Sequence, residues 1–209
     1  MEQSGPTSIT SKKLLVVEGL DEKNFFEKLL PLMGISDFQV ENVGGKGNFR
    51  TQFPALLLRP GFYAPDQTPL VTHMAIIRDK DEDNAFESIK GIVSNAGLNP
   101  PQQNAQFSTG SPRVGIFIMP GSEVEGTMIE DLCLKSVDSL PAMTCVESFA
   151  NCISKLPKPP KNMSKAKVQS FLAAQPEIFN SLGLGAQNNY WDFDSSAFNE
   201  LKAFLSHLK

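Results

Sequence analysis

Strand-like apolar segments alternate with helical patterns along most of this chain, and that alternation limits the folds it can adopt. Four segments have the composition or alternation of strands, at residues 13–17, 38–43, 71–77 and 114–119. Each is followed by a helical pattern, at residues 21–30, 49–58, 84–95 and 127–134. Because parallel strands need a crossover connection, usually a helix, this order predicts an α/β fold with a mostly parallel sheet flanked by helices.

Acidic residues directly follow two of the predicted strands. Glu18 and Gly19 follow the first strand, and Asp79 and Asp81 follow the third. The carboxyl ends of parallel strands meet at one edge of a sheet, where open α/β folds build their sites, so we expect these acids to lie close together. Carboxylate oxygens suit Mg²⁺ or Mn²⁺, which take one or two carboxylates, several waters and substrate phosphates. A second interpretation is that Asp79 and Asp81 only cap the next helix.

Two further acids are candidates for the same site. Glu22 and Glu130 both fall in the first turn of a predicted helix, where the helix dipole favours negative charge. The apolar stripe Ile129, Leu132 and Cys133 predicts that Glu130 faces away from the core. Dipole compensation and metal binding both remain open for these two acids.

Two basic residues are candidates for contact with a phosphate. Lys46 lies in a glycine-rich turn at residues 44–48, and Arg78 precedes Asp79. Successive glycine amides can line an anion-binding nest, although this turn lacks the spacing of a nucleotide-binding P-loop. A plain connection between strand and helix is the other interpretation of the turn.

The pattern changes to helices alone after Asp138. We therefore predict an α/β core over residues 12–137 and a helical C-terminal extension over residues 138–209 that packs on the core. Trp191 and Phe193 are expected to dock the last helix against the body. Cys145 and Cys152 lie seven residues apart in a helical pattern, so both are expected on one face as core filler.

Charge and composition exclude several classes of function. The net charge is −4 and the pI is about 5.3, which argues against a broad basic surface for nucleic acid but not against an enzyme that acts on phosphodiesters. The two histidines, His73 and His207, fit neither a hydrolytic triad nor a histidine-rich zinc site. No apolar run approaches the roughly 20 residues that cross a bilayer, so we expect a cytoplasmic protein without a membrane partner.

Four lysines at 158, 161, 165 and 167 mark a further charged segment. A solvated helix face is the simpler interpretation of this series. A groove for a nucleic-acid backbone remains open.

The motifs together resemble the Toprim family. Residues 14–19 with Asp21, the Asp-Lys-Asp at 79–81 and the helix-leading segment 126–132 look like the motifs of that fold. The resemblance covers roughly residues 12–137 and is greatest to small bacterial Toprim-like proteins of unassigned function and to the Toprim part of overcoming-lysogenization-defect nucleases. It implies that Glu18, Asp79 and Asp81 bind Mg²⁺. We find no companion ATPase segment, primase zinc module or topoisomerase tyrosine region in the sequence, so the resemblance leaves the specific activity open.

Our leading hypothesis is a divalent-metal-dependent phosphodiester or phosphoryl-transfer enzyme, a nuclease that acts on DNA or RNA. Glu18, Asp79 and Asp81 would hold one Mg²⁺, and Glu22 or Glu130 would help to hold a second. The alternative is a non-catalytic module that binds metal or nucleic acid and works through a partner protein. A phosphorylated receiver domain is less favoured, because the first strand then needs an acidic pair where this chain has a single glutamate before glycine.

Overall fold

A computed structural model describes residues 8–80 and 84–209. Across these residues five strands form one sheet in the order β2-β1-β3-β5-β4. The strands are β1 (Lys13–Val17), β2 (Phe38–Asn42), β3 (His73–Asp79), β4 (Gln106–Phe107) and β5 (Arg113–Met119). All neighbouring strands are parallel except β4, which pairs antiparallel with β5 at the sheet edge. The predicted α/β class with a mostly parallel sheet is confirmed.

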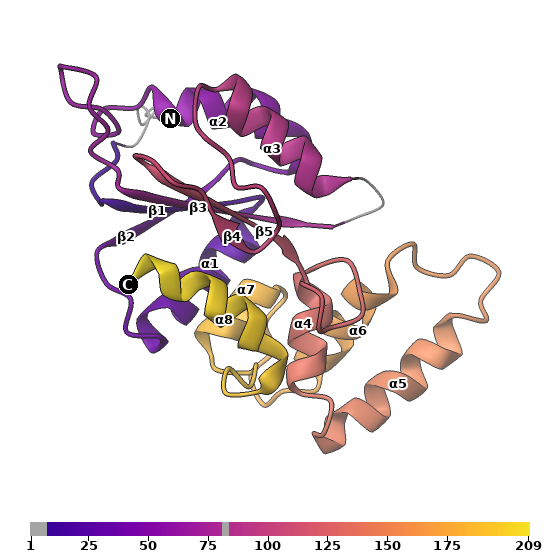
Figure 1. The fold of residues 1–209 in the computed structure, drawn as a ribbon. Coiled ribbons are helices and arrows are strands. Elements are labelled where there is room, and N and C mark those ends of the chain that lie inside the picture. Colours follow the sequence, from indigo (N-terminus) through magenta and orange to yellow (C-terminus); the bar gives the residue numbers. More distant parts are fainter. Residues whose placement is uncertain (1–7, 81–83) are drawn as a thin grey trace, which may run out of the picture.

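Helices cover both faces of this sheet (Figure 1). One face carries two helices, α2 (Phe49–Leu57) and α3 (Ala85–Asn95). The other face carries α1 (Leu20–Leu32), α4 (Ile129–Ser136), α7 (Leu182–Gln187) and α8 (Asn199–Leu205). We call these the α2/α3 face and the α1/α4 face. The described residues also form three short 3₁₀ helices, at Lys46–Asn48, Ser196–Phe198 and Ser206–Leu208.

Strand alternation divides the core between these two faces. Leu14 and Val16 of β1 belong to the apolar cluster under α2 and α3, whereas Leu15 and Val17 belong to the cluster under α1 and α4. Successive side chains of a strand point to opposite faces, and both faces are covered, so the middle of each central strand is apolar.

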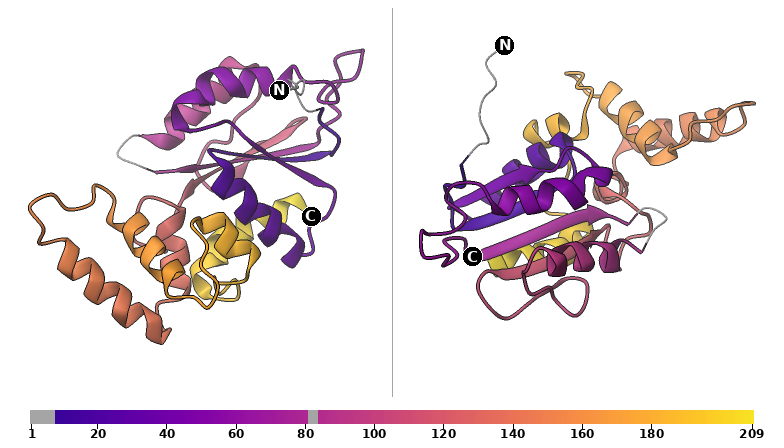
Figure 2. Two further views of the ribbon diagram at one scale, coloured as in Figure 1. Left: turned by 180° about the vertical axis from the view of Figure 1, so that it is seen from behind. Right: turned by 90° about the horizontal axis from the view of Figure 1, so that it is seen from above.

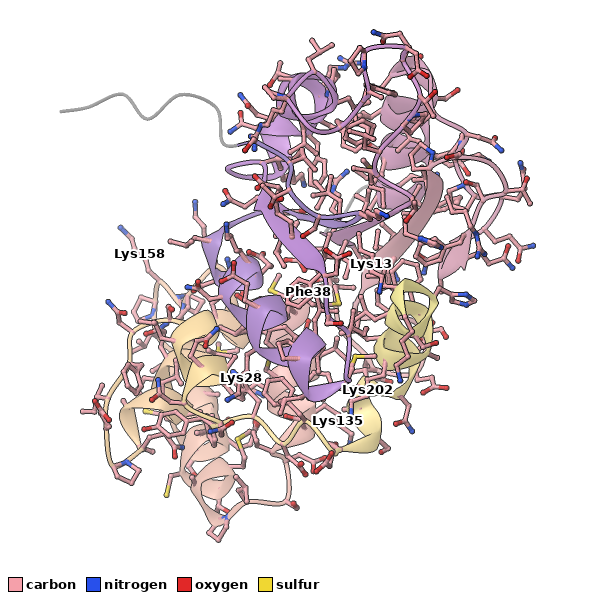
Figure 3. All side chains as sticks on the ribbon, turned by 90° about the vertical axis from the view of Figure 1, so that its left-hand side faces the viewer. Lys13, Lys28, Phe38, Lys135, Lys158 and Lys202 are labelled. Carbon is pink, nitrogen blue, oxygen red and sulfur yellow. The ribbon has the colours of Figure 1, made fainter. Side chains whose placement is uncertain are left out.

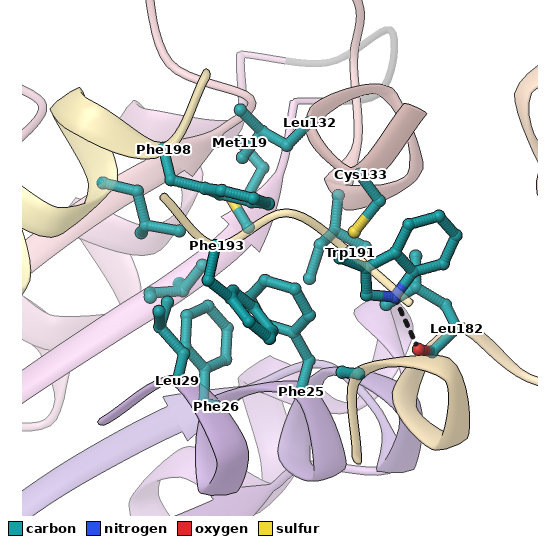
Figure 4. Packing of buried hydrophobic residues seen from close by; sticks show 14 of the residues in the cluster. Phe25, Phe26, Leu29, Met119, Leu132, Cys133, Leu182, Trp191, Phe193 and Phe198 are labelled. Carbon is teal, nitrogen blue, oxygen red and sulfur yellow. Dashed lines mark hydrogen bonds between the residues drawn. The ribbon is translucent and has the colours of Figure 1, made fainter. Parts of the chain in front are cut away.

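The C-terminal helices take part in the core of the α1/α4 face (Figure 4). The ring of Phe25 lies 5.4 Å from that of Phe193 and 5.9 Å from that of Phe198, measured between centroids. Trp191 is buried, and its indole N–H donates a hydrogen bond to the carbonyl of Leu182 (3.0 Å). Trp191 and Phe193 thus lie against the body, as expected from the sequence.

The remaining two helices form a hairpin beyond the sheet. Helix α5 (Pro141–Ile153) packs on α6 (Met163–Ala173), α6 contacts α4, and α5 extends away from the body (Figures 1 and 2). Lys158, in the connection between the two helices, is exposed at the outer side of the molecule (Figure 3).

The prediction that Cys145 and Cys152 fill the core is wrong, because both are exposed. The buried stripe of α5 is Met143, Val146 and Ala150, and the two cysteines share a different face of the helix. Two short elements have no counterpart among the predicted ones: β4 has two residues, and α7 has only six.

The described helices are all too short or too polar to span a lipid bilayer.

Candidate active site

The parallel register brings the ends of β1 and β3 to one edge of the sheet. Val16 pairs with Ile76, so Glu18 after β1 lies level with Arg78 near the end of β3. The carbonyl of Glu18 accepts a hydrogen bond from the N–H of Gly45 (2.7 Å), which places the glycine-rich turn beside it. Glu18 and Asp79 therefore reach the same edge, as the sequence predicts.

Gly19 leaves room for the side chain of Glu22 beside the connection after β1. A Cβ atom on this residue would lie 2.9 Å from Oε2 of Glu22, in the first turn of α1. The tight connection after β1 thus lets the Glu22 carboxylate fold back toward the sheet edge.

Asp79 caps the helix that follows β5. Its Oδ1 accepts a hydrogen bond from the N–H of Ile129 (3.1 Å), the first residue of α4. Capping is thus part of its role, as in the second interpretation of the sequence, but the helix capped is α4. The helix after β3 is capped by Asn84, whose side chain accepts from Glu87. Capping by Asp79 draws the start of α4, and with it Glu130, to the edge of the sheet.

The acids at this edge are close enough to repel one another electrostatically. Burial raises the pKa of Asp79 well above its ordinary value, and the negative charges of Glu130, Glu18 and Glu22 raise it further, in that order. The hydrogen bond from the N–H of Ile129 lowers the pKa of Asp79. Burial is also the largest cause of the raised pKa values of Glu22 and Glu130. Four acids therefore act on one another across a partly desolvated region.

Glu130 does not face away from the core, so that prediction is wrong. It is only 9% exposed, and its Oε2 is shut off from solvent without a hydrogen-bond partner among the described residues. The physical reason is that α4 is covered on most sides: the sheet lies on one side and α6 contacts another. An apolar stripe predicts only which face meets the core, and here a second covering helix buries the polar side as well.

Lys165 is a site residue that the sequence analysis missed. Its Nζ lies 3.7 Å from Oε1 of Glu130, and its charge lowers the pKa of both Glu130 and Glu22. The sequence pattern of the four lysines predicts a solvated helix face or a groove for nucleic acid. No local pattern separates Lys165 from its neighbours, because only the return of α6 to the sheet edge brings it here.

Arg78 and Glu18 form an ion pair at the same edge, on the α2/α3 face. Arg78 is 5% exposed, and its Nε lies 3.4 Å from Oε1 of Glu18. Asp79, the next residue, points to the α1/α4 face because of strand alternation. Lys46 is exposed and lies with Arg78 on the α2/α3 face. The two predicted phosphate contacts are therefore together, but on the other face of the strand from Asp79.

Asp81 lies outside the described residues. In the part of the chain that the structure describes, no three His, Cys, Asp or Glu side chains come together as a metal-ligand group. Glu18, Asp79, Glu22 and Glu130 thus interact through their charges without converging on one point.

The fold and the site together define an α/β protein with a mostly parallel sheet and a cluster of buried and partly buried acids at the carboxyl edge of that sheet. The family described as "Protein of unknown function (DUF3226)" matches residues 12–209, and the chain belongs to this family.

Two solved structures are similar to the chain, both of the C-terminal region of the OLD protein of Xanthomonas campestris pv. campestris. The mercury-phased structure is 18% identical, with a TM-score of 0.39, and the match covers 95% of this chain and 94% of that chain. The platinum-phased structure is 17% identical, with a TM-score of 0.38, and the match covers 95% and 92%. No curated protein matches this chain.

Proposed function

We propose that this protein binds Mg²⁺ or Mn²⁺ at the acidic edge of its sheet and acts there as a nuclease on DNA or RNA. One observation carries the proposal: Asp79 lies partly buried among the charges of Glu130, Glu18 and Glu22, which oppose its ionisation. A divalent cation is the group that would remove this repulsion and favour the ionised carboxylates.

The donor set fits such a cation. Every candidate ligand is a carboxylate, and Oε2 of Glu130 is a buried acceptor without a hydrogen-bond partner in the described residues. Mg²⁺ is commonly held by one or two carboxylates and keeps several waters, so three converging side chains are not required. Asp79 and Glu130 would hold the cation together with Glu18, and Asp81 and Glu22 are the further candidates.

The residues around these ligands have separate tasks. The Ile129 N–H holds one oxygen of Asp79, and Arg78 holds the carboxylate of Glu18. Lys165 is anchored near Glu130, but its side chain is 63% exposed, so its ammonium group can also meet a phosphate of the substrate. The bound cation would supply a Lewis acid for a phosphate oxygen and a water of lowered pKa.

The resemblance to the Toprim family supports the same assignment. In that family a glutamate after the first strand and an Asp-x-Asp after a later strand bind Mg²⁺, which match Glu18, Asp79 and Asp81 here. We extend the proposal to the fold and infer that residues 12–137 form a Toprim-like core.

The test is calorimetric titration with Mg²⁺ and Mn²⁺, followed by cleavage assays on single- and double-stranded DNA and RNA in the same buffers. The informative variants are Asp79→Asn and Glu18→Gln. Asp138→Asn is the matched control, because this carboxylate is exposed and pairs only with Lys135 among the described residues. We expect metal binding and metal-dependent cleavage in the wild type and in the control, and loss of both in the site variants. A wild type that binds neither metal would refute the proposal.

A non-catalytic module that works with a partner protein is the second candidate. The observation in its favour is that Asp79 caps α4 and Glu18 pairs with Arg78, roles that both acids could fulfil without turnover. Metal binding without cleavage on any of the four substrates would favour this module over the nuclease.

A further inference from the structure

A concave region lies on the α2/α3 face, and we call it the α2–α3 pocket. It encloses about 520 Å³, within the range of about 300 to 1,000 Å³ that is usual for ligand sites. Its lining includes Arg78 from β3, Lys46 from the glycine-rich turn and Arg50 from α2. Helix α3 forms the opposite wall.

Three cations gather in the lining of this pocket. Lys46, Arg50 and Arg78 carry positive charge, and the described residues that line the pocket include no acid. The chain as a whole has a net charge of −4. Arginine presents a planar fork of N–H donors and lysine a compact cation, and both suit a phosphate group.

The wall formed by α3 has a different chemistry. Ser88, Gly91, Ile92 and Asn95 lie on one helix face, at the spacing i, i+3, i+4 and i+7. Ser88 and Asn95 supply neutral hydrogen-bonding groups, and Ile92 supplies an apolar surface. A cationic side opposite a neutral, partly apolar wall suits a ligand in which a phosphate is attached to a larger uncharged group.

Gly91 supplies an independent observation. Glycine inside a helix is less stable than alanine by about 0.5 to 1 kcal/mol. A Cβ atom on Gly91 would meet nothing within 4 Å, so no neighbour among the described residues requires glycine there. The absence of a side chain keeps the wall of the pocket open to close approach of a ligand to the backbone.

We propose that the α2–α3 pocket binds a nucleoside phosphate, either free or as one unit of a nucleic-acid strand. Lys46, Arg50 and Arg78 contact the phosphate, and the α3 wall contacts the nucleoside. Binding here needs no divalent cation, so the proposal stands apart from the metal chemistry of the acidic edge. The ion pair between Arg78 and Glu18 is the direct link between the two sites.

The experiment measures binding of three probes in the presence of EDTA: a labelled single-stranded DNA oligonucleotide by fluorescence anisotropy, and AMP and inorganic phosphate by calorimetry. The variants are Arg50→Gln, which removes a positive charge from the pocket, and Gly91→Gln, which adds a side chain to the α3 wall and fills part of the pocket. Lys90→Gln is the matched control, because Lys90 neighbours Gly91 on the same helix and does not line the pocket. Circular dichroism verifies that each variant is folded.

We expect the nucleotide probes to bind the wild type and the Lys90→Gln control alike, and to bind both pocket variants at least about tenfold more weakly. Oligonucleotide binding much tighter than AMP binding identifies a unit of a strand as the ligand, and equal binding identifies a free nucleotide. Failure of AMP and the oligonucleotide to bind overturns the proposal. So does binding of inorganic phosphate with the same affinity as AMP, or an equal loss in the Lys90→Gln control.

Discussion

The two faces of the sheet differ in their charged residues at the same edge. On the α1/α4 face, Asp79, Glu22 and Glu130 are partly buried and repel one another, with Lys165 as the nearby cation. On the α2/α3 face, Arg78 pairs with Glu18, and three cations line the pocket beside it, with no acid among its described lining residues.

Strand alternation is the reason for this contrast. Arg78 and Asp79 are adjacent in β3, and successive side chains of a strand point to opposite faces. A single strand end therefore supplies a cation to one face and an acid to the other. A short charged sequence at the end of a buried strand can thus contribute to two sites, and its net charge says little about either.

The largest expected effect concerns the core that supports the acidic face. Phe25→Ala removes a ring packed against Phe193 and Phe198, so we expect the free energy of unfolding to fall by about 3 to 5 kcal/mol. Denaturant titration measures it, with circular dichroism for the whole chain and the fluorescence of the single tryptophan, Trp191, for the C-terminal part.

The control for that experiment is Phe149→Ala, since Phe149 is 47% exposed and its loss should change stability by about 0.5 kcal/mol or less. Equal effects of the two substitutions would contradict the packing described here. The two probes also test the predicted division into residues 12–137 and 138–209. Coincident transitions indicate one cooperative unit, and separate transitions indicate two.

Metal affinity is expected to show the next largest effect. Asp79→Asn should weaken Mg²⁺ or Mn²⁺ binding by at least the roughly 10- to 100-fold that is typical even for residues that only support a ligand. Calorimetry measures the change, and Asp138→Asn is the control. If the Asp79 variant bound the metal as tightly as the wild type, the acidic face would not be the metal site.

The raised pKa values of the acidic face should make the stability of the metal-free protein depend on pH. The folded-state pKa of Asp79 lies above the unfolded value near 3.8, so between these two pKa values the folded chain binds more protons than the unfolded chain. Stability contributed by this group is therefore present at acid pH and is lost as the pH rises through that interval. The pKa values of Glu22 and Glu130 are also raised and act with the same sign.

Denaturant unfolding over a series of pH values in EDTA measures this effect. Asp79→Asn should reduce the loss of stability toward neutral pH, because the amide cannot ionise. The same pH profile in wild type and variant would show that Asp79 is not the group responsible.

On the opposite face, Gly91→Ala should stabilise the chain by about 0.5 to 1 kcal/mol, because alanine favours the helix and its Cβ meets nothing within 4 Å. Gly97→Ala is the matched control. Its Cβ would also meet nothing within 4 Å, but its φ of +82° strains an L-residue, so this substitution should destabilise. Thermal or denaturant unfolding measures both, and effects of the same sign would contradict this account.

The smallest effect is expected for Lys165→Gln. Removal of this charge should raise the pKa of Glu130 further, and NMR titration of glutamate carboxyl carbons measures the shift. The exposed lysine should alter the free energy of unfolding by about 1 kcal/mol or less. Lys167→Gln, which breaks a pair with Glu147 instead, should leave the titration of Glu130 unchanged.

Much of the fold could be predicted because it is encoded locally. The four apolar segments became β1, β2, β3 and β5, and the helical patterns after them became α1 to α4. The missed elements are short: β4 has two residues, and its pairing with β5 depends on a partner strand rather than on its own pattern. The cysteines of α5 were misplaced because helical periodicity shows which residues share a face but not which face is covered.

The candidate site divides in the same way. The sequence alone determined that Glu18 and Asp79 reach one edge, because the order of strands and helices implies a parallel sheet and parallel strands end together. Strand alternation likewise places Arg78 and Asp79 on opposite faces of the sheet. Only the tertiary structure decided that Glu130 is buried and that Lys165 lies beside it. The periodicity of a segment shows which of its residues share a face. The burial of Glu130 and its contact with Lys165 depend instead on α6, a helix that comes after α5 in the chain and packs against α4.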